Sequence, residues 1–456
     1  MSVSASPNHP DLFDRGTPSI VRLAGFLSLS GLFATSAILI DANMVGPIGD
    51  ETLAGLGLAG SLYGLFMALL FGIGSASQIV LTRAFGEDSP QLFAQRLRLL
   101  LGLGLGISLG LVLLFRFNIH FLVDHLASTS GVGFAAKRYL ELMVYGLPIS
   151  FCAYLLSLSF DVRRQASREL WGFAIEVPLN VTLNALLIYG WLGAPELGIK
   201  GAAIATLISQ SARLAFLLLQ LSRDPYFRST SVHTDTHTEQ EARSAPPLPR
   251  SVLVPVTMNV AALIVGAQAY QLLFAQLSYL HFAAMALMAP WLSISNVLGR
   301  SIALSATITC ADLPKGSDAL HAAIRSNLAA LRVLAPRLAL LFIAATLLTG
   351  GLSWHISGAV RINFMLLIPE AALLVLIRTL SVTITAILRS TDRPKWVFWV
   401  QLALQWGFGL PLLLATILLF ELPIFVAFGF LLCEELLRLI IMGLRLRHLL
   451  VANSKK

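Results

Sequence analysis

The sequence predicts an all-α integral membrane protein with twelve transmembrane helices, arranged as two six-helix lobes with pseudo-two-fold symmetry about the membrane normal. Three observations lead to this fold class. Only 12% of the 456 residues are charged, against about a quarter in soluble domains, and 56% are hydrophobic. Apolar runs recur along the whole chain, each long enough to cross ~30 Å of hydrocarbon as a helix. A polar segment, finally, divides these runs into six and six.

The apolar runs are continuous rather than alternating, which favours helices over the strands of a membrane barrel. The six predicted spans of the first lobe are 20–45, 53–80, 97–117, 139–161, 171–191 and 198–221. Those of the second lobe are 251–278, 282–307, 329–354, 364–388, 396–420 and 424–446. The predicted domains are therefore an N-terminal tail (1–19), the N-lobe (20–221), a polar, Pro-rich linker (222–250), the C-lobe (251–446) and a C-terminal tail (447–456).

Two sequence matches between the halves indicate a duplication. Aligning Leu53 with Phe282 pairs two small-residue-rich span starts, and Pro148 and Pro369 each begin an apolar run that ends in a basic, polar segment. Because each half contains an even number of spans, both halves have the same orientation. The symmetry axis is therefore expected along the membrane normal.

The basic residues predict the orientation of the chain. Of its 32 Lys and Arg residues, 23 fall in the tails, connections and adjoining span ends on the side of the N-terminus and only five on the opposite side. The positive-inside rule then places both termini, and the linker, in the cytoplasm of a multi-pass inner membrane protein. The net charge of +8 follows from this topology, so no nucleic-acid partner is expected.

Composition and motifs also argue against an enzyme. The three cysteines lie inside apolar runs, which excludes a disulfide scaffold, and the nine histidines form no metal-spaced cluster. No nucleophile stands beside a base, so neither a cofactor nor a catalytic residue is expected. Gly102, Gly106 and Gly110 recur every four residues within a span; we interpret them as a close helix-packing face rather than a nucleotide-binding loop.

Asp41 is the most informative residue of the N-lobe, because a carboxylate inside a span is costly and commonly marks an ion or proton pathway. Depth counting places Asn180, Asn184 and Thr206, from the fifth and sixth spans, at a similar level. These oxygens could coordinate Na⁺, or Asp41 could bind and release a proton. The alternative is that Asp41 lies near enough to the interface to be hydrated.

The C-lobe has no copy of this set, but it carries charged residues within its spans. Arg378 and Arg300 suggest contact with an acidic or zwitterionic substrate, with Asn259 and Glu370 as further candidate substrate contacts. The equally weighted alternative is a structural latch in which Arg378 pairs with Glu370, Asp392 or backbone carbonyls.

Three segments resemble the multidrug and toxic compound extrusion (MATE) transporters of the multidrug, oligosaccharidyl-lipid and polysaccharide exporter (MOP) superfamily. They are IDANMVGPIGDETLAGLGLAG, PLNVTLNALLIYGWLGAPELGIKGAAIAT and, more weakly, LRSTDRPKW. The resemblance implies a V of two lobes around a central cavity and efflux driven by Na⁺ or H⁺. It also implies that Asp41 is the ion site, with Asn180, Asn184 and Thr206 at matching ligand positions. Many relatives have Asp where this chain has Asn184, and others carry acids near Asn259 and Arg378, which this chain lacks.

The sequence therefore predicts an ion-coupled antiporter that exports small organic compounds, such as drugs, toxins or metabolites, by alternating access. It is expected to act as a monomer in contact with membrane lipid, with H⁺ or Na⁺ as the coupling ion and no other metal. The first alternative is a flippase for lipid-linked saccharides, in which Arg300 and Arg378 would hold a pyrophosphate. A polytopic membrane enzyme is the less favoured alternative.

Overall fold

The computed structural model describes residues 17–87, 89–163, 165–227, 248–276, 278–311, 317–352, 356–391, 394–419 and 424–452, and within these ranges the regular structure is helical. The helices of the first half are α1 (Thr17–Val45), η1 (Gly46–Ile48), α2 (Asp50–Gly86), α3 (Pro90–Leu126), α4 (Ser130–Met143), α5 (Gly146–Val162), α6 (Ala166–Tyr189), η2 (Trp191–Gly193) and α7 (Ile199–Arg223). Those of the second half are α10 (Arg250–Phe274), α11 (Tyr279–Ala311), α12 (Asp318–Leu352), α13 (Gly358–Thr391), α14 (Pro394–Leu402), η3 (Ala403–Gly409), α15 (Leu410–Leu419) and α16 (Ile424–Ala452).

Each of the twelve predicted spans coincides with helix in the part of the chain that the structure describes. Ten helices there are long and apolar enough to cross a membrane, or eleven if the bent pair α4 and α5 forms one span. α16 coincides with the twelfth predicted span and carries Glu434, Glu435 and Arg438 along its length. The predicted tails and linker fall largely outside the described residues, which omit 1–16, 228–247 and 453–456.

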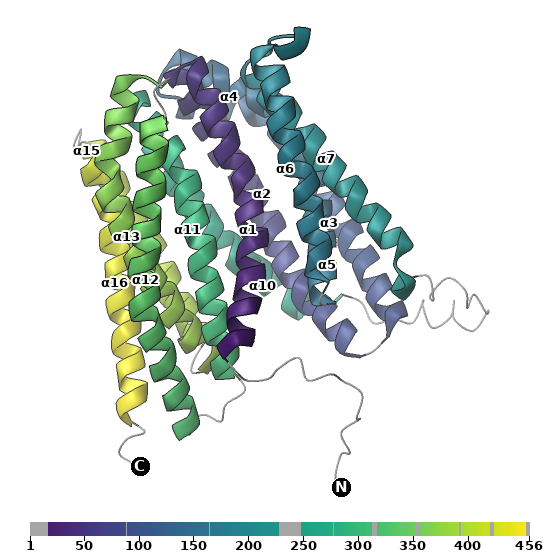
Figure 1. Ribbon diagram of the computed structural model, residues 1–456, viewed down its shortest axis with the longest axis vertical. Coiled ribbons are helices and arrows are strands. Elements are labelled where there is room, and N and C mark those ends of the chain that lie inside the picture. Colours follow the sequence, from purple (N-terminus) through teal and green to yellow (C-terminus); the bar gives the residue numbers. More distant parts are fainter. Residues whose placement is uncertain are drawn as a thin grey trace, which may run out of the picture.

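The helices form two sets that meet along four central helices (Figure 1). α10 of the second half packs along α2 of the first, and α1 of the first half packs along α11 of the second. Exchanging the halves interchanges these two contacts, as two-fold symmetry requires. α1 begins and α16 ends at the same end of the bundle, and toward that end the flanking helices α7 and α16 lean apart (Figure 1).

The aligned span starts occupy equivalent places in the two halves. Leu53 is 0% exposed and Phe282 is 1% exposed, and each is the fourth residue of its helix, in α2 and α11 respectively. The two prolines differ, because Pro148 lies in the first turn of α5 whereas Pro369 lies inside the continuous helix α13. The duplication is thus better preserved at the central helices than at the outer ones.

The contact between the halves depends on small residues. A Cβ atom built on Gly72 of α2 would lie 2.5 Å from the carbonyl oxygen of Thr257 in α10. No side chain fits at that separation, so the two helices approach backbone to backbone.

The fourth predicted span is broken into α4 and α5, which are bent by 56°. The sequence predicted one helix over 139–161, but α4 begins at Ser130. Pro148 is the third residue of α5, where its missing N–H removes no intrahelical hydrogen bond. The proline therefore fits the start of a new helix better than the middle of a continuous one.

The eleventh span is interrupted by the π-helical segment η3. Such segments contain more residues per turn than an α-helix and often occur at functional sites. Two side chains of this segment donate to backbone carbonyls of α10: Gln405 Nε2 to Leu263, and Trp406 Nε1 to Ala262, both at 3.2 Å. They fix η3 against α10.

The interpretation of Gly102, Gly106 and Gly110 as a packing face is wrong. In the described part of the chain, no atom from outside this stretch of α3 lies within 4 Å of a Cβ built on any of the three, and all three are exposed. The close contact occurs instead at Gly104, where a Cβ would lie 1.9 Å from the ring of Phe151 in α5.

A buried ion-pair cluster joins the ends of α5, α6 and α7. Asp224 Oδ2 lies 2.7 Å from Nη1 of Arg163 and 2.6 Å from Nη1 of Arg168. The Arg163 guanidinium also lies over the rings of Phe227 and Phe160, at 4.7 and 5.1 Å from their centroids. Charge and aromatic contacts together hold the chain just beyond α7 against the lobe.

Candidate functional site

Asp41 lies one turn before the end of α1 and is buried, with 5% of its surface exposed. α6 and α7 each bring one polar side chain to it. Asn184 Nδ2 donates to Asp41 Oδ1 at 2.6 Å, and the Thr206 hydroxyl oxygen lies 3.0 Å from Asp41 Oδ2. Both carboxylate oxygens therefore contact residues of helices other than α1. This burial does not fit the alternative in which Asp41 lies close enough to the interface to be hydrated.

Asn180 completes the set from one turn earlier on α6. Its Nδ2 donates to the Thr206 hydroxyl at 3.3 Å, and its Oδ1 accepts from Asn184 Nδ2 at 3.2 Å. Residues four apart lie on the same face of a helix, which is why both amides reach one point. The structure thus brings together all four residues of the predicted ion site.

The hydroxyl of Thr206 allows two arrangements of hydrogen atoms. Its oxygen lies 3.0 Å from Asp41 Oδ2 and 2.9 Å from the carbonyl oxygen of Ala202, yet it carries a single hydrogen. If Thr206 donates to Asp41, Oδ2 is an acceptor, as it is in an ionised carboxylate. If it donates to Ala202, the contact to Asp41 requires a protonated carboxyl group that donates to Thr206. The same heavy-atom geometry therefore accommodates Asp41 with and without a proton.

One acceptor of the site has no partner. Asn184 Oδ1 is buried and accepts no hydrogen bond from the described residues. A buried unsatisfied acceptor costs about 1–3 kcal/mol, so a ligand that supplies a positive charge or a hydrogen would be stabilised there. Among the described residues no group of three His, Cys, Asp or Glu side chains could hold a metal ion. A cation at Asp41 would accordingly be held by one carboxylate together with amide and hydroxyl oxygens.

Two neighbouring groups complete the surroundings. Tyr139 of α4, which sequence reasoning missed, is 6% exposed and lies close enough to interact with Asp41 and Thr206. It is the first residue of the predicted fourth span (139–161), where a tyrosine is ordinary at a membrane interface, so its position alone did not mark it as part of the site. Glu176, on the same face of α6 as the asparagines, pairs instead with Arg213 Nη1 at 2.8 Å.

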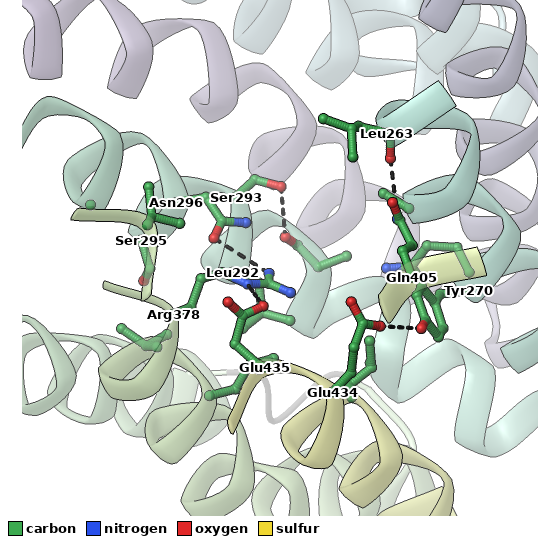
Figure 2. A pocket seen from close by; sticks show the side chains of 18 of the residues that line it. Leu263, Tyr270, Leu292, Ser293, Ser295, Asn296, Arg378, Gln405, Glu434 and Glu435 are labelled. Atoms are coloured by element: carbon green, nitrogen blue, oxygen red, sulfur yellow. Dashed lines mark hydrogen bonds and ion pairs between the residues drawn. The ribbon is translucent and has the colours of Figure 1, made fainter. Parts of the chain in front are cut away.

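The C-lobe contains a separate cavity of about 520 Å³, lined by α10, α11, α13, α14, η3 and α16. Figure 2 shows its polar wall, a chain of side chains that runs from Asn296 through Arg378 to Glu435, with Glu434 facing Tyr270. Arg438 joins the two carboxylates: its Nη1 lies 3.0 Å from Glu435 Oε2, and its Nη2 donates to Glu434.

Only two of the four predicted substrate-binding residues line this cavity. Arg300 and Arg378 line this cavity, whereas Asn259 and Glu370 do not. Arg378 contacts Glu435 and Asn296 rather than Glu370, and Asp392 lies outside the described residues. The latch predicted between Arg378 and Glu370 is therefore not formed.

Glu434 and Glu435 are the functional candidates that sequence reasoning missed. They stand four and three residues before Arg438 in the twelfth span, and adjacent acids within an apolar run are themselves a signal of a functional or paired site. Their position in the last span, far in sequence from Arg378, concealed the pairing.

Comparison with known proteins shows which fold and which family this chain resembles. Residues 27–186 match the MatE family model. The probable multidrug resistance protein NorM of Bradyrhizobium diazoefficiens is 27% identical over 209 residues, which is 45% of this chain and 44% of that protein. The chain thus spans less than half the length of this relative. The probable multidrug resistance protein NorM of Geobacillus kaustophilus is 25% identical over 416 residues, 86% of each chain.

A solved structure extends the likeness to the whole fold. It is an inward-facing conformation of a multidrug resistance MATE family transporter of the MOP superfamily, with a TM-score of 0.75 at 14% identity over 94% of this chain and 96% of that one. The fold is that of a solved MATE family transporter, and the helices of this chain are long and apolar enough for a multi-pass membrane protein. The resemblance to the MATE family is confirmed: the chain carries a MatE domain, its relatives include NorM proteins, and it has the MATE fold.

Proposed function

We propose that the protein is an inner-membrane antiporter that exports small organic compounds by alternating access, with H⁺ or Na⁺ as the coupling ion bound at Asp41. The observation that carries this proposal is the buried carboxylate whose two oxygens are held by Asn184 and Thr206. The family likeness supports export, since the relatives' names include multidrug resistance proteins.

The charge of Asp41 is expected to govern the site. A carboxylate removed from water is stabilised by hydrogen bonds or by a cation, and no Lys, Arg or His forms an ion pair with Asp41 among the described residues. Binding a proton or a sodium ion would neutralise it. Neutralisation from the outer side would then favour the state that releases substrate outward.

The position of Asp41 supports coupling to the relative placement of the lobes. α1 packs against α6 and α7 of its own half and along α11 of the other half. The helix that carries the ion site is thus also part of the interface between the halves. An ion can shift the equilibrium between two states only if it binds them differently, and the set on α6 and α7 provides ligands that a movement of α1 would change.

The flippase alternative receives less support. It needs free arginines for a pyrophosphate, but the cavity that contains Arg300 and Arg378 also contains Glu434 and Glu435. With three arginines and two carboxylates, the lining has a net charge of about +1, which is too little to balance the two or more negative charges of a pyrophosphate. We further propose that the protein functions as a monomer with lipid around it and without a nucleic-acid partner.

The test is ion-driven export from proteoliposomes that contain purified protein and a fluorescent amphipathic substrate. With Asp41→Asn, an imposed H⁺ or Na⁺ gradient is expected to drive no more export than in vesicles without protein, because the ion has lost its charged ligand. Asp124→Asn, at an exposed ion pair on α3, serves as the matched control and should export like the wild type. Export by Asp41→Asn at the wild-type rate would overturn the proposal.

The same vesicles distinguish the two ions. A pH gradient imposed without Na⁺ and a Na⁺ gradient imposed at equal pH are compared in separate runs. The gradient that drives export identifies the coupling ion, and export driven by neither gradient contradicts ion coupling.

A further inference from the structure

The cavity in the C-lobe has an excess of positive charge. Its lining contains three arginines, Arg300, Arg378 and Arg438, but only two carboxylates, Glu434 and Glu435. The distribution of partners among these five groups decides which charge is available to a ligand.

The two carboxylates are already satisfied. Arg438 Nη1 lies 3.3 and 3.0 Å from the two oxygens of Glu435, and Arg438 Nη2 donates to Glu434. The hydroxyl of Tyr270 donates to the other oxygen of Glu434. Glu434 and Glu435 are only 3% and 2% exposed, so a cationic ligand would find them covered.

Arg378 is held loosely by comparison. Its Nε lies 3.4 Å from Glu435 Oε2 and its Nη1 lies 3.4 Å from Asn296 Oδ1, whereas charge-assisted hydrogen bonds are typically about 2.7–2.9 Å long. The side chain is 28% exposed, while that of Glu435 is 2% exposed. Part of the guanidinium therefore faces the cavity (Figure 2).

Arg300 adds a second guanidinium to the same cavity. It follows Asn296 by four residues on α11, which places both on one helix face, and it is exposed. It forms no ion pair with a described Asp or Glu. Two guanidiniums, from α11 and α13, thus line the same cavity, and the carboxylates there do not fully neutralise them.

The remaining lining is apolar and of suitable size. Leu263, Met285, Leu292, Leu374 and Phe428 surround the polar wall. A volume of about 520 Å³ falls in the range of small-molecule sites, which bury most of a ligand's surface against such side chains.

We propose that this cavity binds a small amphipathic organic anion, whose carboxylate contacts Arg378 and Arg300 while its apolar body lies against the leucines and Phe428. The inference rests on the proposed export function, for which it names the substrate class. An arginine offers a planar fork that matches a carboxylate, so the anion would take the place of the long contact between Arg378 and Glu435. An amine of the same shape would meet two guanidiniums and no available carboxylate.

The test is calorimetric titration of purified protein with three ligands of one shape: 2-naphthoate, its methyl ester and 2-naphthylmethylamine. Naphthoate is expected to bind roughly tenfold or more tightly than either of the others, since a hydrogen bond to a charged group contributes about 1.5–3 kcal/mol. Equal or tighter binding of the amine would overturn the proposal.

Arginine variants localise the binding. Arg378→Gln and, independently, Arg300→Gln are expected to weaken naphthoate binding roughly tenfold and to leave ester binding unchanged. Arg378→Lys, which retains the charge, should bind with intermediate affinity. Arg332→Gln, on the exposed surface of α12, is the control and should bind like the wild type. Naphthoate binding that is unchanged in both Arg378→Gln and Arg300→Gln overturns the assignment.

These titrations use no ion gradient, so the two proposals can fail separately. Arg378-dependent binding of naphthoate without ion-driven export refutes the export function and leaves the anion site standing. Ion-driven export of a cationic dye without Arg378-dependent binding of naphthoate refutes the anion site and leaves the export function standing.

Discussion

Thr206 makes several contacts within the proposed ion site at Asp41. Its hydroxyl lies within hydrogen-bond distance of Asp41, of the amide of Asn180 and of the carbonyl of Ala202. A valine keeps the shape of the side chain but can neither donate nor accept, so it removes all three contacts at once.

Thr206→Val is therefore expected to slow ion-driven export and to lower stability by about 1–3 kcal/mol, because it leaves buried polar groups unpaired. Initial export rates and thermal unfolding measure the two effects. Thr182→Val is the matched control, because this threonine lies on the exposed side of α6 and, among the described residues, its hydroxyl donates to the carbonyl of Pro178 in its own helix. Equal rates in the two variants would contradict the role given to Thr206.

Asp224 is the residue on which the ion-pair cluster at the end of α7 depends. Arg163 has a side chain only 2% exposed and cannot be rehydrated without local unfolding. Removing its counter-charge leaves a buried cation, which typically costs about 3–5 kcal/mol.

Asp224→Asn is expected to lower the free energy of unfolding by about 3 kcal/mol in detergent, as measured by thermal unfolding. Asp124→Asn removes an ion pair whose carboxylate is 58% exposed, and this variant should change stability by less than about 1 kcal/mol. Similar losses of unfolding free energy in the two variants would show that the buried cluster stabilises the protein no more than an exposed ion pair does.

The same pair gives stability a pH dependence. Burial alone raises the pKa of Asp224. The hydrogen bond and charge of Arg163, together with Arg168 and the backbone N–H of Tyr226, lower it by more than burial raises it, so the pKa lies below its usual 3.8. A carboxylate with a lowered folded-state pKa contributes stability above its unfolded pKa and loses it as the pH falls through the folded value. The difference between the wild type and Asp224→Asn should accordingly stay constant at neutral pH and shrink below about pH 4.

At the scale of single elements, α3 shows why a spanning helix is hard to interpret from sequence. Small residues occur on two faces, at Gly102, Gly106 and Gly110 and at Gly104 and Ser108. Only the second face is buried. A helix surrounded by lipid on one side and protein on the other is apolar all round, so its hydrophobic pattern does not distinguish the faces.

Gly104→Ala is expected to destabilise the protein by about 1–3 kcal/mol, because its methyl group would overlap the buried ring of Phe151. Gly106→Ala, two residues along the same helix, meets open space and should cost nothing measurable. Thermal unfolding of the two variants side by side is the measurement. A loss confined to Gly106→Ala would reverse the assignment of the faces.

The break between α4 and α5 is a second feature that the sequence predicted only in part. An apolar run indicates where a chain crosses the membrane, and the predicted span 139–161 does overlap both helices. It does not indicate where backbone hydrogen bonds are interrupted, because neighbouring helices can satisfy the freed groups. Pro148 is the one residue in the sequence that indicates a break here. Its position in the first turn of α5 depends on a separate helix, α4, that begins at Ser130.

At the scale of the whole molecule, the number and order of the spans were predictable because the membrane imposes length and apolarity on each of them. The N-lobe set was also predictable, since Asn180 and Asn184 share a face and the depth of Asp41 follows from helix rise. The C-lobe cavity was not. Its pairs join Arg378 to Glu435 and Tyr270 to Glu434, and contacts between distant spans depend on helix packing that sequence spacing does not encode.

The predicted orientation of the molecule rests on the distribution of its basic residues and can be tested with fusions. Green fluorescent protein fused to the C-terminus should fluoresce, because that end is predicted to be cytoplasmic, and alkaline phosphatase at the same place should be inactive. A phosphatase fusion truncated after Gly193, in the connection between α6 and α7, should be active. The reverse pattern would invert the topology.

The contact at Gly72 limits how the two halves can move. Because the backbones of α2 and α10 touch there, the helices cannot close further, and no side chain separates them to act as a sliding layer. If one half rotated against the other, the axis of rotation would pass near this contact. The displacement of each helix would then be smallest there and would grow with distance along the helix. A bulkier residue at position 72 would force α2 and α10 apart at this axis rather than merely weaken their contact.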